Sequence, residues 1–365
     1  MSDKKLAVLG IVAVLMAGLA ILQNRISQNV NTADFRSSPL IQGFQPEAVS
    51  AIAVMSRQGQ QATTLNQKNG TFVVADKESY PADVSKINRV INDCLDIRVH
   101  EKVTDNPANH ADLGVTEETA QFVVRFLDKN GGQIVGLAVS EAGEKGTAFA
   151  RLLSSNDVYS TQSPPWVTAR PMDYVDPQLL QIQQDKIQSV AVKTEEGSYE
   201  LTATQDKQDI QLKDMPAGKQ FKGTGYKTVF RALSSLRFDD VASEPKAPEG
   251  LNFNSSYVCT LNDKTVYHLG LAQKDDKTYA KVSADYLDKT PVEKERRVES
   301  EEELKEKEAK LMAMDAVKAF NQKHQRWVYE IPSYQAQNLT KPLSELLEDA
   351  PEPEKEPQAA DPNAV

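Results

Sequence analysis

Cysteine and histidine are scarce in this chain, which argues against most metal and thiol chemistry. Two cysteines and four histidines occur among its 365 residues. The histidines are His100, His110, His268 and His324. None has a second histidine at the spacing of ligands on one helix, and no cysteine pair lies near them. We therefore predict no catalytic residue, no metal site and no cofactor, and we interpret His100 and His110 as solvated residues of an acidic loop.

Signature sequences for nucleophiles, nucleotides and calcium are absent as well. The chain has no Gly-x-Ser-x-Gly sequence. The glycine-rich run from Gly218 to Gly225 lacks the Lys-Ser/Thr ending of a phosphate-binding loop, so we expect an ordinary loop before a helix. Asp275 and Asp276 are predicted to form a turn, because no alternating oxygen ligands follow them. These absences favour a non-enzymatic protein.

Positive charge is in deficit, which bears on the partners of the chain. The formal net charge is -10 and the sequence pI is about 5.1. A chain of this charge is poorly suited to nucleic acid or to an anionic lipid surface as its main partner. Apolar residues still make up 40% of the sequence, so real cores are expected.

The two cysteines allow two interpretations. Cys94 and Cys259 fall at non-equivalent places of the repeat described below. We favour two small buried thiols, and a disulfide between them outside the cytoplasm is the alternative.

One uncharged apolar run, residues 6–22, is the feature most informative about location. It follows Lys4 and Lys5, which favours a cytoplasmic N-terminus at residues 1–5 and a membrane anchor at residues 6–23. A cleaved signal peptide, with a weak site at Gly18 and Ala20, and a buried soluble helix are the alternatives. We predict a single-pass inner-membrane protein whose body lies in the periplasm.

The body of the chain reads as two copies of one pattern, residues 46–180 and 181–347. Val49–Val54 is repeated by Ile187–Val192, and both alternate apolar and polar residues as strands do. Asn69-Gly70 joins two further strand-like runs, which is a strong hairpin signal. Asp83 is a suitable N-cap for a helix that continues to Leu95, and a second-copy helix is expected from Thr224 to Leu236.

The second copy carries a charged insertion at residues 292–325. We predict a single apolar stripe along it, formed by Val298, Leu304, Leu311, Met312, Val317 and Phe320. Pairs of Glu and Lys four residues apart support a helix here. The helix is predicted either to lie on its own domain, which we favour, or to project as a coiled-coil arm that docks a partner helix or makes a dimer.

Polar segments flank the two copies. Residues 24–45 are predicted to be a tether, and residues 348–365 a disordered acidic tail. Trp166 and Trp327 are expected to serve packing. The predicted fold class is therefore α+β: an N-terminal transmembrane helix, then two tandem, mostly antiparallel units of sheet and helix.

This pattern resembles the bacterial family called domain of unknown function 4340. The resemblance rests on the helix at 82–95, Leu113-Gly114, Phe149-Ala-Arg151, Val158-Tyr159 and residues 173–180. Phe72 stands where the family often has tryptophan, and the insertion at 292–325 lengthens the second copy. Members are often encoded beside ABC-type transporters of the gliding-motility kind, so the resemblance implies an extracytoplasmic accessory role.

The expected function is a non-enzymatic accessory or scaffold subunit of an ABC-type transport complex. Its partners would be the inner membrane through residues 6–23 and a permease, ATPase or auxiliary protein, with no nucleic acid. The alternative is a periplasmic binding module for a small ligand or envelope polymer, held in a cleft between the two copies. A hydrolase with an unfamiliar site is a third class.

Overall fold

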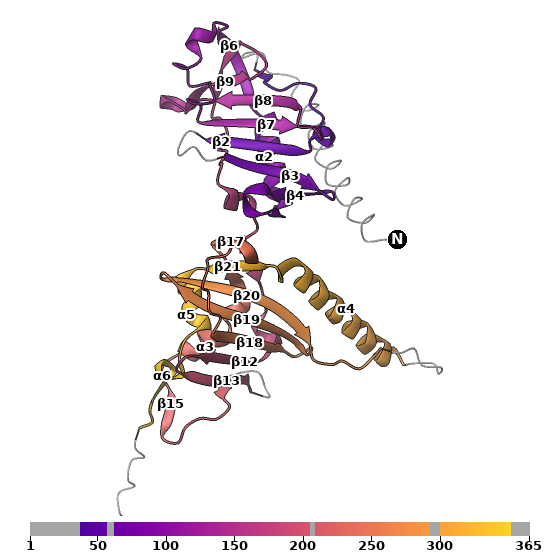
Figure 1. Ribbon diagram of the computed structural model, residues 1–365, viewed down its shortest axis with the longest axis vertical. Helices are drawn as coiled ribbons and strands as arrows, with labels where there is room; N and C mark the ends of the chain where they lie inside the picture. Colours follow the sequence, from indigo (N-terminus) through magenta and orange to yellow (C-terminus); the bar gives the residue numbers. More distant parts are fainter. Residues whose placement is uncertain (1–36, 57–61, 205–208, 293–299, 352–365) are drawn as a thin grey trace, which may run out of the picture. The chain divides into compact units, whose positions relative to one another are not determined.

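The computed structural model describes residues 37–56, 62–204, 209–292 and 300–351. The chain divides into two compact units, Met1–Asp176 and Pro177–Val365 (Figure 1). Each unit has its own antiparallel sheet, and each is described by itself below.

The described part of the first unit is built on a ten-stranded sheet. Its order is β1-β6-β10-β9-β8-β7-β2-β3-β4-β5. The bounds are β1 Ser38–Pro39, β2 Ala51–Ser56, β3 Ala62–Lys68, β4 Thr71–Val74, β5 Tyr80–Pro81, β6 Arg98–Thr104, β7 Phe122–Leu127, β8 Gln133–Val139, β9 Thr147–Leu152 and β10 Val158–Gln162. The strand β2 lies inside the sheet, between β3 and β7.

The described part of the second unit has an eight-stranded main sheet of order β14-β13-β12-β18-β19-β20-β21-β17, with two small sheets, β11-β16 and β15-β22. The bounds are β11 Gln178–Leu180, β12 Ile187–Thr194, β13 Gly197–Ala203, β14 Ile210–Leu212, β15 Lys219–Phe221, β16 Leu236–Arg237, β17 Asp240–Ser243, β18 Ser255–Leu261, β19 Thr265–Lys274, β20 Lys277–Tyr286, β21 Trp327–Ile331 and β22 Leu347–Asp349.

The two units repeat one strand order. In the first unit, β4-β3-β2-β7-β8-β9-β10-β6 run side by side, and β14-β13-β12-β18-β19-β20-β21-β17 do so in the second. The corresponding strands also follow one another in the same order along the chain in both units. The segments that look alike in the sequence therefore occupy equivalent places in the two sheets.

Tight turns set the register of the hairpins. Asn69 and Gly70 both have positive φ, 51° and 83°, between β3 and β4. Asp275 and Asp276, with φ of 50° and 60°, connect β19 to β20 in the same way. Two consecutive residues at positive φ match the right-handed twist of the strands, which is why short hairpins use them.

The helix α2 (Val84–Leu95) covers one face of the first sheet. The Asp83 carboxylate accepts a hydrogen bond of 2.8 Å from the Ser85 amide and so caps the helix. Its buried residues are Ile87, Val90, Ile91 and Cys94. This spacing places them on one side of the helix, toward the core.

The opposite face of the first sheet has a core of its own. The loop after β6 lays Val115 and Ala120 on Val123, Ala138 and Val158. The guanidinium of Arg151 donates to the Val115 carbonyl oxygen, with Nη2 at 3.1 Å, and thereby holds the loop in place. The first unit is consequently closed on both faces in this region.

Helices of the second unit gather on one face of its main sheet. They are α3 Gly225–Phe230, α4 Glu301–His324, α5 Ser333–Leu339 and α6 Leu343–Leu346. Tyr257 donates to the Val229 carbonyl oxygen of α3 at 2.8 Å. Tyr267, the register partner of Cys259, contacts Phe320 of α4. Since Tyr257 and Cys259 are two residues apart on β18, α3 and α4 lie on the same face.

The predicted fold class is wrong in two respects. Strand residues outnumber helical residues in the described part of the chain, so the fold is mostly β rather than the predicted α+β. No helix among the residues that the structure describes is long and apolar enough to cross a membrane, and the expected N-terminal transmembrane helix is not supported. Residues 1–5 and 6–23, to which that expectation referred, lie outside the described residues.

The predicted segment boundaries also need correction. β1 pairs with β6, and Leu40 and Ile41 are buried, so this part of the expected tether at 24–45 belongs to the first sheet. β22 takes up the first residues of the expected tail at 348–365 and pairs with β15. β11 lies before the expected boundary at 180 yet pairs with β16 of the second unit. The remaining parts of the tether and tail, 24–36 and 352–365, lie outside the described residues.

Candidate functional site

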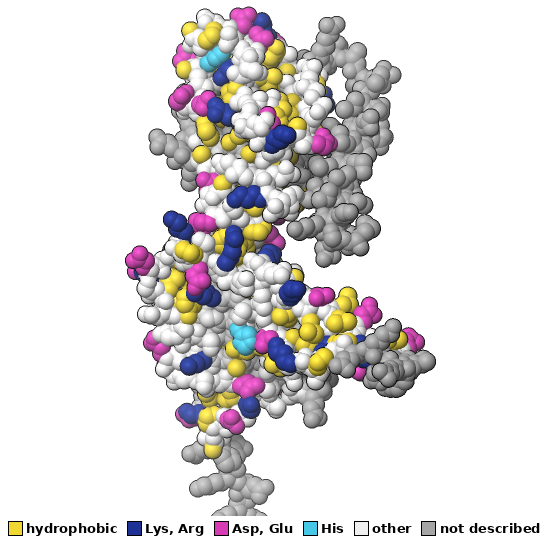
Figure 2. All heavy atoms as spheres, turned by 45° about the vertical axis from the view of Figure 1, so that its right-hand side comes forward, with side chains coloured by type: hydrophobic (Ala, Val, Ile, Leu, Met, Phe, Trp, Pro, Cys, Tyr) yellow, Lys and Arg dark blue, Asp and Glu magenta, His cyan; other side chains and the backbone are white. Residues whose placement is uncertain are grey.

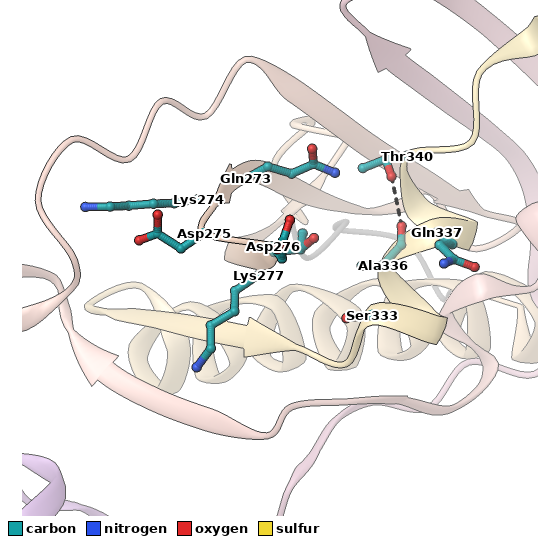
Figure 3. A pocket seen from close by; sticks show the side chains of 10 residues that line it. Gln273, Lys274, Asp275, Asp276, Lys277, Ser333, Ala336, Gln337 and Thr340 are labelled. Carbon is teal, nitrogen blue, oxygen red and sulfur yellow. Dashed lines mark hydrogen bonds between the residues drawn. The ribbon is translucent and has the colours of Figure 1, made fainter.

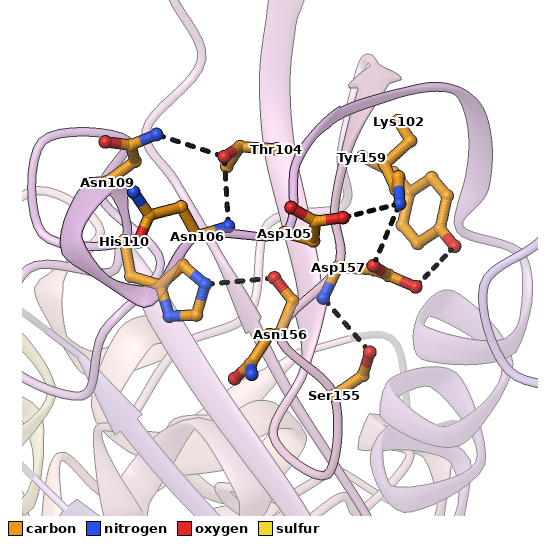
Figure 4. A network of polar contacts seen from close by, with 10 residues as sticks. All are labelled: Lys102, Thr104, Asp105, Asn106, Asn109, His110, Ser155, Asn156, Asp157 and Tyr159. Carbon is orange, nitrogen blue, oxygen red and sulfur yellow. Dashed lines mark hydrogen bonds and ion pairs between the residues drawn. The ribbon is translucent and has the colours of Figure 1, made fainter.

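In the first unit, the loop that carries His110 is held by a network of hydrogen bonds and ion pairs (Figure 4). His110 is buried, and its Nε2 donates to the Asn156 carbonyl oxygen at 3.0 Å. Lys102 reaches Asp105 at 2.9 Å and Asp157 at 3.4 Å, and hydrogen bonding from Lys102 lowers the pKa of the Asp105 carboxyl. His100 is exposed, unlike His110. The prediction of a solvated loop is therefore wrong for His110, which fastens the loop to its neighbour.

The cysteines are both free and buried, Cys94 in the first unit and Cys259 in the second. Burial raises the pKa of the Cys259 thiol to about 12, and it raises that of Cys94 still further. Such thiols are protonated and inert. This is the state that we favoured over a disulfide.

The glycine run and the two tryptophans, also singled out in the sequence, have different environments. In the glycine run 218–225, β15 pairs with β22, so part of the expected loop is strand. Trp327 is buried, whereas Trp166 is 74% exposed. Among the described residues, no group of three or more His, Cys, Asp or Glu side chains is placed to hold a metal ion.

The helix α4 is fastened to the sheet through the C-terminal half of its length. Asn321 accepts from the Ala284 amide and donates to the Ala284 carbonyl oxygen, both at 2.8 Å. The rings of Phe320 and Tyr267 meet edge to face, with centroids 5.2 Å apart. His324 Nδ1 lies 2.7 Å from the Tyr329 hydroxyl oxygen. Together these contacts fix the helix axis relative to β20.

His324 is buried at the end of α4, and this burial changes its chemistry. Desolvation, helped by the nearby charge of Lys323, lowers the pKa of His324 to about 4. The imidazole is therefore neutral at neutral pH, and its Nδ1 can accept a hydrogen bond from the Tyr329 hydroxyl. His324 serves as a hydrogen-bonded core residue.

An ion-pair cluster holds the middle of α4. Lys310 Nζ lies 2.9 Å from Asp288 Oδ1 and donates to the Thr290 hydroxyl at 2.6 Å. Lys264 approaches the other carboxylate oxygen of Asp288 at 3.2 Å. The hydrogen bond from Thr290, together with those from both lysines, holds the pKa of Asp288 well below its ordinary value. Asp288 therefore keeps its charge and this attachment through the neutral range.

The outer face of α4 carries exposed apolar side chains (Figure 2). Of the ten large apolar residues exposed in the described part of the chain, four are Leu304, Leu311, Met312 and Met314. At about 100° per residue, Leu304 and Leu311 point roughly opposite to Phe320 and His324. Exposed fractions of 53% for Leu304 and 67% for Met312 show that their own sheet does not cover them. We call Leu304, Leu311 and Met312 the outer apolar face.

The predicted single apolar stripe of the insertion is thus two separate faces. Val317 and Phe320 turn inward, whereas Leu304, Leu311 and Met312 turn outward. Val298 lies outside the described residues. The sequence interpretation missed Asn321 and His324, although their spacing from Val317 and Phe320 puts them on the same side of a helix.

A polar groove lies at one end of the second sheet (Figure 3). The β19–β20 turn and α5 enclose about 360 Å³, lined among others by Gln273, Asp276 and Gln337. A neighbouring hollow of about 410 Å³ shares Gln273 and Thr340 with it. The two lysines of the turn are engaged elsewhere, since Lys274 donates to the Glu249 carbonyl oxygen and Lys277 to Glu330. Amide, hydroxyl and carboxyl groups therefore dominate the lining.

The fold and these surfaces define a duplicated antiparallel β protein, with a fastened helical arm and a polar groove in its second half. The chain belongs to the family described as domain of unknown function (DUF4340), whose model matches residues 73–254. This match runs from β4 through the loop before β18, and α4 lies outside it. No curated protein and no solved structure matches the chain.

Proposed function

We propose that this protein is a non-enzymatic accessory or scaffold subunit of an ABC-type transport complex, working outside the cytoplasm. The observation that carries the proposal is the construction of α4. Three kinds of contact fasten the helix to its sheet, while Leu304, Leu311 and Met312 are presented to solvent. A rigid helix with an uncovered apolar face suits protein contact, because little ordering entropy is lost when it docks.

The clustering of exposed apolar residues on one helix supports a role in binding another protein. Single exposed apolar residues are ordinary on protein surfaces and need no explanation. Here three of them cluster on one face, and burying the exposed part of each, about half of the side chain, would contribute roughly 1–2 kcal/mol. The transport complex as the setting follows from the family resemblance and is part of the proposal.

Co-purification tests the proposal. Full-length chain is cross-linked in cells, isolated, and analysed by mass spectrometry beside Met312→Lys and the control Val103→Lys, an exposed apolar residue of the first unit. We expect a permease and an ATPase with the native chain and with the control. A charge in the contact that costs about 1.4 kcal/mol of binding free energy weakens binding tenfold. We therefore expect Met312→Lys to lower their recovery about tenfold. Isolation of the native chain without either protein would contradict the proposal.

The proposed location has its own test. A reporter enzyme active only outside the cytoplasm is fused after Val365. We expect reporter activity in intact cells. Activity of a matched cytoplasmic reporter instead would contradict an extracytoplasmic body.

The polar groove supports a second candidate, a binding module for a polyhydroxylated ligand such as an envelope saccharide. Exposed Gln273 and Gln337, with Thr340, offer the donors and acceptors that such ligands use. Calorimetric titration with envelope oligosaccharides, comparing the native chain with Gln273→Ala, tests it. Binding that Gln273→Ala leaves unchanged would place the ligand elsewhere.

A further inference from the structure

We propose that the outer apolar face of α4 is a self-association surface, through which two copies of this chain pair by antiparallel α4 helices. The inference deepens the proposed function, on which it rests, by assigning this face to a second copy; the transport proteins then bind the dimer, and Met312→Lys lowers their recovery by dissociating it. It draws on the apolar face and on the charge pattern along the helix.

Charge is segregated along α4. Residues 301–308 hold five glutamates and two lysines, a net charge of -3. Residues 318–324, the last two turns of α4, hold Lys318 and Lys323 and no acid, a net charge of +2 with His324 neutral. The apolar residues Leu311 and Met312 lie between the two ends. One helix thus carries an acidic end, an apolar middle and a basic end.

This pattern is complementary to itself only when one copy is reversed. In an antiparallel pair, each acidic end meets the basic end of the other copy, and the apolar middles meet each other. A parallel pair would set like charges side by side and point the two helix dipoles in the same direction, and both effects are repulsive. A two-fold symmetric contact uses the same patch on both copies, which a self-complementary helix provides.

The attachment of α4 leaves this face available. The contacts with the sheet come from Asn321, Phe320 and Lys310. At about 100° per residue, Leu304 and Leu311 point about 160–180° away from Phe320 and about 80–120° away from Asn321 and Lys310. A second α4 can therefore lie along the face without displacing any contact that holds the first.

Sedimentation of the purified full chain is the first experiment. We expect a dimer whose dissociation constant rises as salt screens the end charges. Met312→Lys should raise the dissociation constant at least tenfold, and Val103→Lys should leave it unchanged. Circular dichroism and melting temperature confirm that both variants are folded. A native chain that is monomeric at all concentrations, or a dimer that Met312→Lys does not weaken, overturns the inference.

Cross-linking through single engineered cysteines tests the orientation. The native thiols Cys94 and Cys259 are buried and contribute little background. Met312→Cys, near the middle of α4, should cross-link to the same position of the second copy. Glu301→Cys should not, because two copies of residue 301 would lie about 33 Å apart at ~1.5 Å per residue on each side of the midpoint. Linking of Glu301→Cys with itself would show a parallel pair and overturn the antiparallel arrangement.

The two proposals fail in distinguishable ways. A monomeric native chain whose permease and ATPase are lost on Met312→Lys would overturn self-association and leave the proposed function standing. A dimer that Met312→Lys dissociates, isolated without permease or ATPase, would support self-association and count against the transport complex.

Discussion

At the scale of single residues, polar side chains determine how α4 is attached. β21 pairs with β20 only at residues 278–280, and none of the described strands pairs with the outer edge of β20 beyond them. The side-chain amide of Asn321 pairs with this edge instead, through two hydrogen bonds to the backbone of Ala284. An unpaired backbone group in a half-buried position costs free energy, which explains an asparagine at this point of the helix.

Replacing Asn321 should loosen the helix from the sheet. Asn321→Leu keeps the size of the side chain and removes both hydrogen bonds to Ala284. We expect the free energy of unfolding of the second unit to fall by about 1–3 kcal/mol, because the backbone groups of Ala284 remain unpaired. Chemical denaturation monitored by circular dichroism measures it. The exposed neighbour Gln322→Leu is the matched control and should change stability by less than about 0.5 kcal/mol.

Acid should weaken the second unit through His324. Its pKa is about 4 in the folded chain against 6.5 as the ordinary value, so the unfolded chain binds the proton more readily. Stability is full above pH 6.5 and falls as the pH drops toward 4, by up to about 3 kcal/mol. Denaturation between pH 7 and 4 should show this loss, and His324→Gln should remove most of it. Identical pH profiles for the two proteins would refute the assignment.

At the scale of elements, local patterns were predictable and distant pairings were not. The helix at Asp83–Leu95 could be predicted because its N-cap and its apolar spacing are contained in the segment itself, and α2 has these bounds. The expected helix from Thr224 to Leu236 is shorter than predicted, since α3 ends at Phe230 and a 3-10 turn, Ala232–Ser235, follows. A periodic apolar spacing does not distinguish a continuous helix from a helix followed by such a turn.

Short strands at the ends of the units escaped prediction for a physical reason. β1 and β22 owe their structure to partners far along the chain, β6 and β15. Nothing in two or three residues of their own sequence predicts that pairing. The site features follow the same rule: the α4 helix could be expected from its Glu and Lys pairs, whereas the groove depends on α5 meeting the β19–β20 turn.

At the scale of the whole molecule, the chain is two units with separate cores. Tyr174, Phe122 and Phe126 are fully buried in the first, and Tyr257 and Tyr329 in the second. The division falls between Asp176 and Pro177. Because each unit completes its own sheet, each should fold without the other.

Separate expression of residues 37–176 and 177–351 tests this independence. We expect each fragment to give a cooperative melting transition close to one of two transitions of the full chain. Differential scanning calorimetry makes the comparison. A fragment that stays unfolded would show that its core depends on the other half.

The central position of β2 has a consequence for synthesis on the ribosome. β2 emerges before both of its partners and can pair early with β3, but its other edge must wait for β7, whose first residue is Phe122. Until then the nascent chain exposes an apolar strand edge, a surface that aggregates readily. β12 repeats the same delay before β18 emerges. Newly made chains should therefore depend twice on holdase chaperones, once for each sheet, and slowing translation between the paired strands should increase that dependence.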